Sequence, residues 1–394
     1  MRDQPIRLAG PIAMTFWARR VRVVRVGIMV IVGLSLLVAL WVGLIRIGWS
    51  LPIPQTGLLL AHGPLMVCGM LMTVVSLERA VALGRIWSYI APVLGAVGAI
   101  SLVVGAPPAV AMLAILISSA LLVAAYAIIV RRQAAIFTWT MALGAVLLLS
   151  GNILWLTGWP VFRVVPWWMG FLVLSIAGER LELSRVQRLP SSALRMFVMA
   201  AALMTVGIVG TTIWPDAGTR VMGIGAGALA IWLLNHDIAR RTIKAHGLPR
   251  YIAICLLGGH IWLALGGMLA MIFGFSSSGF LYDATLHTVF VGFVISMIFG
   301  HMLIILPAVI GVMVAPLKHF YVPLVLLHVS LIMRVTGDVF AQSDLRRWGG
   351  LLNVTALLAY FALLVYATRI ANRVTHATNQ PLENSSHHEN LSPA

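Results

Sequence analysis

Charged side chains are scarce in this chain. Only 10% of its 394 residues are charged, and just 11 of them are Asp or Glu. Soluble globular proteins carry roughly 25% charged and about 45–50% apolar residues, whereas 61% of this sequence is hydrophobic. These proportions exclude a soluble globular enzyme, a disordered protein and a nucleic-acid binder, despite the net charge of +16. A chain of this composition requires lipid as its solvent.

Cysteine is almost absent, and a secretory signal is not evident. Cys68 and Cys255 both lie in apolar runs, where a thiol usually packs as a small hydrophobe, and two such residues cannot form a Cys-rich metal site. Residues 1–25 contain six arginines and no apolar core of the kind that precedes a cleavage site. We therefore expect residues 1–25 to form a basic cytoplasmic segment.

Long apolar runs make up most of the remaining sequence. A membrane-spanning helix needs about 20 predominantly apolar residues. Twelve stretches meet this requirement: 26–46, 57–78, 88–106, 108–130, 134–157, 161–181, 193–214, 217–239, 250–273, 282–306, 318–336 and 348–368. We predict an all-α polytopic membrane bundle of about 12 transmembrane helices, forming a single domain over 26–373. The polar residues 374–394 are predicted to be a disordered cytoplasmic tail.

Basic residues are distributed unevenly over the predicted loops. With the N-terminus placed inside, 21 of the 27 Lys and Arg residues fall on the inner side and 6 on the outer side. Cytoplasmic loops carry an excess of Lys and Arg, so the sequence predicts an N-in/C-in topology. We expect a multi-pass protein of the bacterial inner (cytoplasmic) membrane, with the lipid bilayer as its main partner.

Histidine is the main ionisable residue inside the predicted spans. The spans contain His62, His260, His287, His301 and His328, with no Asp or Lys near their middle. A cation-coupled carrier usually needs a carboxylate there, whereas neutral imidazole is a usual ligand of haem iron and copper. The sequence therefore favours a haem or copper protein over a transporter.

Two of these histidines are expected at matching depth. His62 and His287 each lie about five residues from the outer end of the second and tenth spans, roughly 8 Å below the boundary. We predict that they clamp haem b from its two faces, with Met66 and Gly69 on the His62 face and Gly292 beyond His287. Glycine lets a flat ring approach the backbone. Alternatively, each imidazole only hydrogen-bonds to a neighbouring helix.

The other three histidines are expected in the inner half of consecutive spans. His260, His301 and His328 could together hold copper or a second haem. The alternative is that they are structural and satisfy each other's hydrogen bonds.

Arginines at the outer boundary are candidates for contacts with haem propionates, which are anionic. Arg334 and Asp338 are spaced i, i+4, and Arg346 and Arg347 follow in the next outer loop, on the side where the histidine pair is expected. The alternative is a boundary ion pair followed by Trp348 as an interfacial anchor.

Two spans end inside with the dipeptide Glu-Arg. These are Glu78–Arg79 and Glu179–Arg180. They are either ion pairs at the boundary or the mouth of a proton path.

Taken together, these residues resemble subunit I of the haem–copper oxidase superfamily. The resemblance lies in the twelve-span plan, the His62-Gly63-x-x-Met66 opening, the histidine in the tenth span and the Arg346–Arg347 pair. It implies that His62 and His287 ligate a low-spin haem and that the arginines meet propionates. In that family the sixth and seventh spans supply copper ligands, but here they contain no histidine. The sequence is more similar to NnrS-type proteins, which are haem and copper membrane proteins linked to nitric oxide metabolism.

We therefore expect a haem-binding membrane protein, with copper as a second candidate metal, that handles nitric oxide or a related diatomic, or transfers electrons. One alternative is a quinol-linked oxidase or nitric oxide reductase with a displaced binuclear centre. Another is a metal-free transporter or assembly factor. The expected partners are a diatomic gas or quinol, and no nucleic acid.

Overall fold

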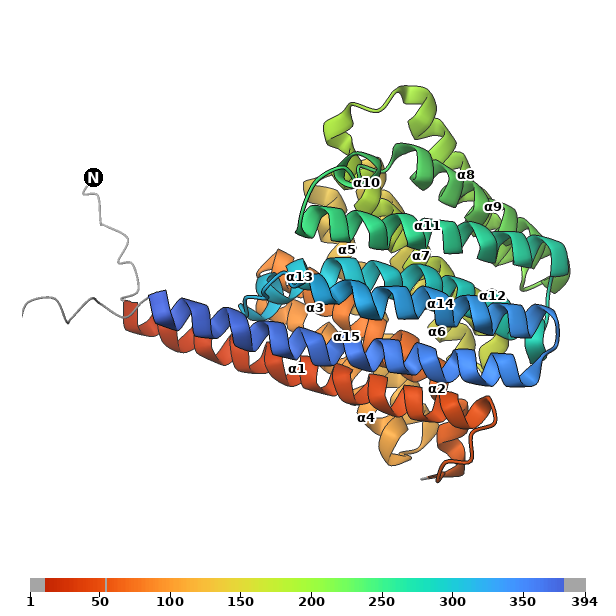
Figure 1. Ribbon diagram of the computed structural model, residues 1–394, viewed down its shortest axis with the longest axis horizontal. Coiled ribbons are helices and arrows are strands. Elements are labelled where there is room, and N and C mark those ends of the chain that lie inside the picture. Colours follow the sequence, from red (N-terminus) through yellow and green to blue (C-terminus); the bar gives the residue numbers. More distant parts are fainter. Residues whose placement is uncertain (1–10, 54, 379–394) are drawn as a thin grey trace, which may run out of the picture.

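The computed structural model describes residues 11–53 and 55–378, and within these ranges every regular element is a helix (Figure 1). The elements are α1 (Pro11–Arg46), η1 (Thr56–Leu60), α2 (His62–Pro64), η2 (Leu65–Met72), α3 (Thr73–Leu83), η3 (Ile86–Tyr89), α4 (Ile90–Val104), α5 (Pro108–Arg132), α6 (Ile136–Leu156), α7 (Val161–Ser184), η4 (Arg185–Gln187), α8 (Ser191–Gly210), α9 (Pro215–His236), α10 (Ala239–Thr242), α11 (Leu248–Phe273), α12 (Gly279–His287), η5 (Thr288–Ile295), α13 (Ser296–Ile310), η6 (Lys318–Phe320), α14 (Tyr321–Val339) and α15 (Ser343–Thr378).

These elements form twelve helical stretches that are long and apolar enough to cross a membrane, as predicted. They are Arg20–Arg46, His62–Leu83, Ile86–Val104, Pro108–Arg132, Ile136–Leu156, Val161–Gln187, Ser191–Gly210, Pro215–His236, Leu248–Phe273, Gly279–Ile310, Lys318–Val339 and Ser343–Arg373. The all-α fold and the number of spans are therefore confirmed by the described part of the chain.

Several predicted boundaries differ from the structure. The second span begins at His62 rather than at residue 57, because a 3₁₀ turn at η1 precedes it. At the C-terminal end, α15 continues as helix through residues 374–378, beyond the predicted limit of the transmembrane domain at residue 373. Residues 379–394, like residues 1–10 of the basic segment, lie outside the described residues. The helix α1 already begins at Pro11.

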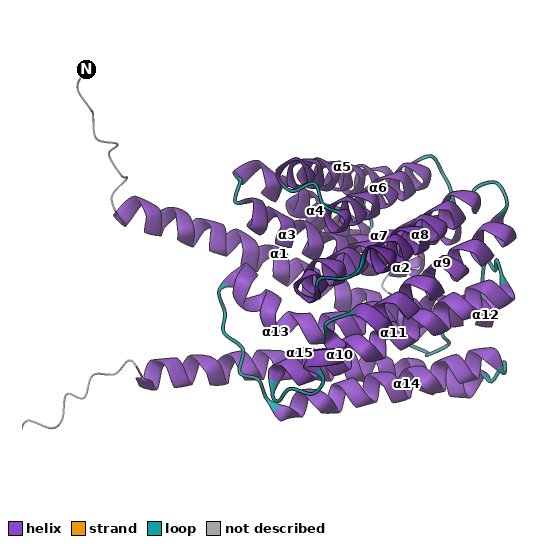
Figure 2. Ribbon diagram, turned by 90° about the horizontal axis from the view of Figure 1, so that it is seen from above, coloured by secondary structure: helices purple, strands orange, loops and turns teal. Residues whose placement is uncertain are grey.

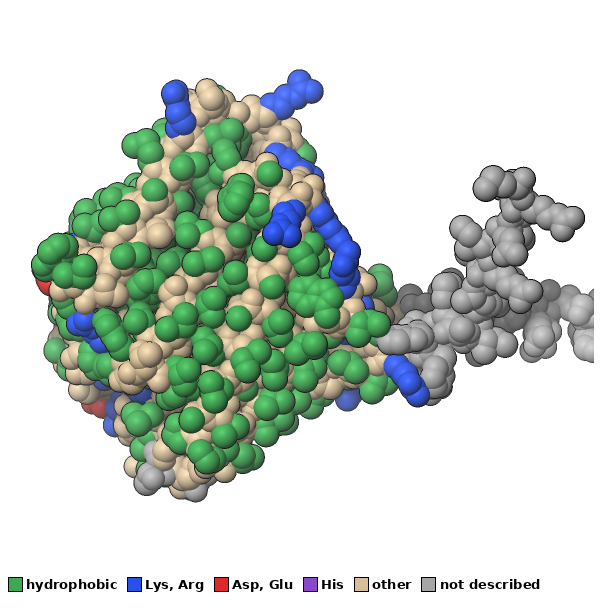
Figure 3. Space-filling view, turned by 180° about the vertical axis from the view of Figure 1, so that it is seen from behind, with side chains coloured by type: hydrophobic (Ala, Val, Ile, Leu, Met, Phe, Trp, Pro, Cys, Tyr) green, Lys and Arg blue, Asp and Glu red, His purple; other side chains and the backbone are tan. Residues whose placement is uncertain are grey.

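Both terminal helices reach the same end of the bundle. In Figures 1 and 2, α1 begins and α15 ends on the same side. We call this the proximal end and the opposite side the distal end. Figure 3 shows hydrophobic side chains over most of one face of the bundle, with most of the Lys and Arg on that face lying toward the proximal end. Such a surface suits a lipid environment.

Small residues let the helices pack closely. A Cβ on Gly223 of α9 would lie 2.6 Å from the carbonyl oxygen of Gly267 of α11, and a Cβ on Gly267 would lie 2.6 Å from the backbone nitrogen of Gly227. Membrane helices associate through van der Waals packing at such surfaces. The backbone at Gly223 and Gly227 of α9 therefore lies against Gly267 of α11.

Candidate functional site

The structure brings His62 and His287 together near the distal end. His62 is the first residue of α2 and His287 is the last residue of α12. Their ring centroids are 6.4 Å apart and their ring planes differ by 27°. Their matched depth thus arises from the tertiary arrangement, since the two residues occupy different positions along their helices. The expectation that both lie about five residues into a span was wrong for His62.

Each imidazole ring is held in place by a hydrogen bond at one of its two nitrogens. The Nδ1 of His62 lies 2.8 Å from the carbonyl oxygen of Ala39, and the Nδ1 of His287 lies 2.9 Å from the carbonyl oxygen of Asp283. A carbonyl only accepts hydrogen bonds, so both Nδ1 atoms are donors, and each neutral ring keeps its Nε2 lone pair. A histidine that binds a metal usually makes this second hydrogen bond, which fixes its tautomer and orientation.

A π-helical segment follows each histidine. Leu65–Met72 is π-helical just after His62, and Thr288–Ile295 is π-helical directly after His287. π-Helical turns are rare and occur frequently at functional sites. The wider turn also frees backbone carbonyls, and Thr73 donates a 3.0 Å hydrogen bond to the carbonyl of Cys68. The same local distortion therefore occurs on both helices that carry the pair.

Helix α1 approaches the His62 ring at a glycine. A Cβ on Gly43 would lie 3.0 Å from Cε1 and 3.2 Å from Nδ1 of His62. Any larger residue would push against the imidazole. The sequence analysis missed Gly43, because only the folded structure places α1 beside His62.

The two glycines expected to admit a macrocycle have other neighbours. A Cβ on Gly69 would meet Ala99 at 3.1 Å and Ser35 at 3.5 Å. A Cβ on Gly292 would meet the ring of Trp262. Both glycines therefore allow close packing between protein segments, which corrects the expectation that they face a porphyrin. Met66 is half-buried and packs against the apolar core.

A buried charged cluster lies beside His287. Arg334 of α14 donates two hydrogen bonds to Asp283 of α12, at 2.8 and 2.9 Å. Arg346 lies 3.0 Å from Asp338 and 3.5 Å from Asp283, as ion pairs outside hydrogen-bond geometry. Ion pairs therefore do form at this boundary, as the alternative to propionate contacts predicts, but Arg334 pairs with Asp283 and Asp338 pairs with Arg346.

Asp283 was not predicted as a site residue. The sequence feature that could have indicated it is its position, as a single acidic residue in an otherwise apolar segment, four residues before His287. Intramembrane carboxylates are costly and mark functional or structural partners.

Arg347 has weaker acidic partners than Arg334 and Arg346. It lies 3.7 Å from the exposed Asp344 and over the ring of Trp49 at 5.0 Å. Trp348 packs edge-to-face on Trp49 at 5.3 Å. These contacts tie the start of α15 to the end of α1.

The second histidine group is not assembled as one site. His301 lies 3.2 Å from Arg180, His328 accepts a 2.9 Å hydrogen bond from Trp262, and His260 lies 3.6 Å from Asp237. Among the described residues, no group of three or more His, Cys, Asp or Glu side chains is placed to hold a metal ion. The structure therefore does not bring His260, His301 and His328 together as one set, because His260 and His301 lie beside the Arg180–Asp237 pair whereas His328 is turned to Trp262.

Arg180 and Asp237 form a buried pair on the proximal side. Arg180 donates two hydrogen bonds to Asp237, at 2.7 and 2.8 Å. Burial alone would raise the pKa of the Asp237 carboxyl, but the hydrogen bonds and charge of Arg180 outweigh it and hold the pKa below its ordinary value. Asp237 lies between α9 and α10, so the pair fixes this connection to α7.

The other Glu-Arg pair bridges two helices. Arg79 of α3 lies 2.7 Å from Glu78 and 2.5 Å from Glu179 of α7. Two carboxylates thus share one guanidinium.

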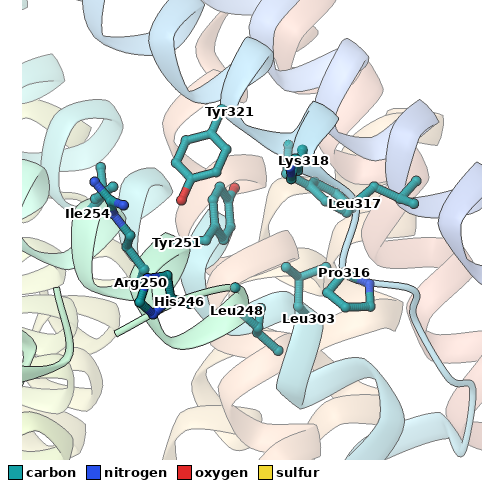
Figure 4. Close-up of a pocket in the computed structure, with 12 residues that line it drawn as sticks. His246, Leu248, Arg250, Tyr251, Ile254, Leu303, Pro316, Leu317, Lys318 and Tyr321 are labelled. Atoms are coloured by element: carbon teal, nitrogen blue, oxygen red, sulfur yellow. The ribbon is translucent and has the colours of Figure 1, made fainter. Parts of the chain in front are cut away.

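Two cavities have linings that do not include the histidine pair. The first, of about 640 Å³, is lined by α1, η2, α3, α7, α13 and α15 residues that include Glu78, Glu179 and His301. The second, of about 490 Å³, lies between α11 and α14. Figure 4 shows Tyr251 and Tyr321 facing each other there, with Arg250 and Lys318 on either side. The second cavity contains no paired histidines.

Comparison with known proteins identifies a family. No curated protein matches the chain significantly. No solved structure matches it significantly either. Residues 25–369 match the profile of a family described as a domain of unknown function, DUF8744, and this stretch covers all twelve spans in whole or nearly so. The chain therefore belongs to the DUF8744 family.

Proposed function

We propose that this protein is a membrane electron-transfer protein that holds one b-type haem between His62 and His287. The separation of the two rings is the observation that carries the proposal. A metal stands about 2 Å from a histidine nitrogen, and the nitrogen is about 1.1 Å from its ring centre, so two opposite ligands have centroids about 6.2 Å apart. The observed separation is 6.4 Å.

The hydrogen bonds of the pair fit the same assignment. Both Nδ1 atoms donate to backbone carbonyls, which leaves both Nε2 lone pairs for iron. Both side chains are partly buried, and that of His287 is 16% exposed. A bound haem supplies reversible one-electron chemistry, and the apolar surroundings would tune its potential by excluding water.

If His62 and His287 both held the haem, the site would favour electron transfer over lasting gas binding. With both histidines in place, no side of the haem would be left open for nitric oxide or a related diatomic. We therefore place the handling of a diatomic, which the resemblance to NnrS-type proteins implies, second to electron transfer.

The arginines differ in their suitability for haem propionates. Arg334 and Arg346 already neutralise Asp283 and Asp338. Arg347 is 38% exposed and its nearest acidic partner, Asp344, is 91% exposed. We assign the propionate contact to Arg347 first, because its present ion pair is the weakest of the three.

The proposed topology is N-in/C-in in a bacterial inner membrane. It rests on the excess of Lys and Arg in the loops that this orientation makes cytoplasmic. The histidine pair then lies toward the outer leaflet.

The test is a visible spectrum with iron analysis of detergent-purified protein. Wild type should contain one haem per chain with reduced low-spin bands, and His62→Ala and His287→Ala should each lose those bands. His328→Ala is the matched control, because His328 contacts Trp262 away from the pair, and should keep the wild-type spectrum. Unchanged spectra in both pair variants would overturn the ligand assignment.

The same sample separates the alternatives. Carbon monoxide binding by the reduced wild type would favour a quinol-linked oxidase or nitric oxide reductase. Protein without iron would favour a metal-free transporter or assembly factor. Both outcomes count against the present proposal.

A further inference from the structure

The cavity of about 640 Å³ opens to the lipid-facing surface between α1 and α15. Its lining includes Leu34 and Leu37 of α1 and Val365 of α15, and these side chains are 56%, 50% and 52% exposed. In Figure 2, α1 and α15 lie apart toward the proximal end, with α13 drawn between them. A membrane-dissolved molecule can therefore enter from the bilayer without crossing water.

Polar groups gather at one part of this otherwise apolar cavity. They are Glu78, Ser175, Glu179, His301 and Thr368. Glu78 and Glu179 each give one oxygen to Arg79, and no described residue makes a hydrogen bond to the other oxygen. Their side chains are 29% and 31% exposed. Ser175 is 3% exposed, and its hydroxyl lies toward Gly144 of α6 rather than into the cavity, since a Cβ built on Gly144 would lie 3.2 Å from its Oγ.

The charges at this end select the chemistry of the occupant. Two carboxylates share one guanidinium, so the cluster has an excess of hydrogen-bond acceptors and of negative charge. His301 adds no free acceptor, because its Nδ1 faces the carbonyl of Met297 and its Nε2 faces Arg180. An anionic headgroup would be repelled. A neutral polar group that donates hydrogen bonds would be bound.

The cavity also extends toward the histidine pair. Leu36 lines it and lies three positions before Ala39, whose carbonyl contacts His62. Val294 lines it from the π-helical segment that follows His287. Along a helix axis, the three residues from Leu36 to Ala39 span about 4.5 Å, and the seven from His287 to Val294 span about 10 Å. The far wall is therefore only one to two helical turns from the proposed haem ligands.

We propose that this cavity binds a membrane-soluble hydroquinone, with its ring hydroxyls at Glu78 and Glu179 and its tail toward the lipid between α1 and α15. The cavity volume lies within the range of about 300–1,000 Å³ that is common for small-molecule sites. This inference rests on the proposed function only for the choice of a redox-active donor molecule.

The test is anaerobic equilibrium binding of a radiolabelled hydroquinone with a ten-carbon tail to protein in phosphatidylcholine nanodiscs. The wild type should bind it at one saturable site. The 1,4-dimethyl ether of the same compound keeps the ring and tail but lacks both donors, and it should bind at least tenfold more weakly. Equal binding of both compounds would mean that the cavity holds apolar chains only, and would overturn the proposal.

Two glycines of α1 provide a matched pair of variants. Neither Gly33 nor Gly27 has an atom within 4 Å of a built Cβ, so both accept a side chain without a clash. Gly33 lines the cavity and Gly27 is not among its lining residues. Gly33→Phe should weaken binding at least tenfold, and Gly27→Phe should leave it unchanged. Equal binding by the two variants would contradict the assignment.

The polar end is tested by removing charge without changing shape. Glu78→Gln and Glu179→Gln should each weaken hydroquinone binding about tenfold, since hydrogen bonds to charged groups are the stronger ones. Wild-type affinity in both variants would overturn the proposed position of the hydroxyls.

Failure of this proposal and failure of the proposed function give different results. His62→Ala should lose the haem spectrum and still bind hydroquinone. Hydroquinone binding by a wild type without haem would leave this site intact and overturn the proposed function. Wild-type protein that contains haem but does not bind hydroquinone would overturn the hydroquinone site and leave the proposed function intact.

Discussion

At the scale of single residues, the distal charged cluster determines how firmly His287 is held. The backbone carbonyl of Asp283 accepts a hydrogen bond from His287, and its carboxylate accepts hydrogen bonds from Arg334. A buried carboxylate without its partner is strongly destabilising, typically by about 3–5 kcal/mol. The histidine pair and the ion pairs beside it should therefore respond together to mutation.

Replacing Arg334 tests this coupling. Arg334→Met should lower the unfolding free energy by about 3 kcal/mol, because Asp283 then keeps only Arg346 at 3.5 Å and the His287 ring at 3.3 Å, and loses both of its hydrogen bonds from Arg334. Arg220→Met is the control, since Arg220 and Asp216 form an exposed pair with side chains 42% and 59% exposed. Such pairs contribute about 0–1 kcal/mol. Denaturation in detergent measures both variants, and equal losses would contradict the role given to Asp283.

The Arg180–Asp237 pair leads us to predict that the connection between α9 and α10 is sensitive to acid. Its pKa is lowered in the folded protein, chiefly by Arg180 acting against burial. A lowered folded-state pKa gives stability that is fully present above the ordinary value of about 3.9 and is lost as pH falls through the folded-state pKa. The wild-type melting temperature should therefore fall more steeply below about pH 4 than that of Asp237→Asn. Parallel curves would show that this pair does not carry the acid dependence.

At the scale of helices, most of what could be predicted came from length and composition. Runs of apolar residues identified all twelve spans, because a helix crossing lipid must be long and apolar whatever its neighbours are. Helix ends were less predictable. The 3₁₀ turn before His62 and the π-helical segments after both histidines depend on tertiary contacts, and no sequence pattern marks them.

The contact between α1 and α2 gives a prediction at this scale. Gly43→Leu should displace the His62 ring, since even a Cβ would lie 3.0 Å from Cε1. Gly27→Leu on the same helix meets nothing within 4 Å and serves as the control. Under the proposed function, the Gly43 variant should lose or alter the low-spin bands while the Gly27 variant keeps them. Identical spectra would show that α1 does not position His62.

At the scale of the whole molecule, the candidate site depends on contacts that no local pattern reveals. Counting from helix ends brought His62 and His287 to a common depth, and the fold does place them together. The same reasoning failed for His260, His301 and His328, because similar depth does not determine which way a ring faces. The packing of α1, α12 and α14 brings three further residues to the site, and the sequence alone did not predict this arrangement of Arg334, Asp283 and Gly43.

The topology of the bundle is a further prediction. Tags placed at the N- and C-termini should both be cytoplasmic, and a tag after Gly158, in the turn between α6 and α7, should be on the opposite side, because most Lys and Arg then lie inside. Protease accessibility in sealed vesicles measures this. A cytoplasmic tag after Gly158 together with cytoplasmic termini would contradict the order of the spans.

Electron paramagnetic resonance of the oxidised, purified protein tests the haem assignment most directly. We expect a single low-spin ferric signal of the type given by two neutral imidazoles with nearly parallel planes, in keeping with the 27° angle between the rings of His62 and His287. A purely high-spin ferric signal, or protein that contains no haem iron, would contradict it.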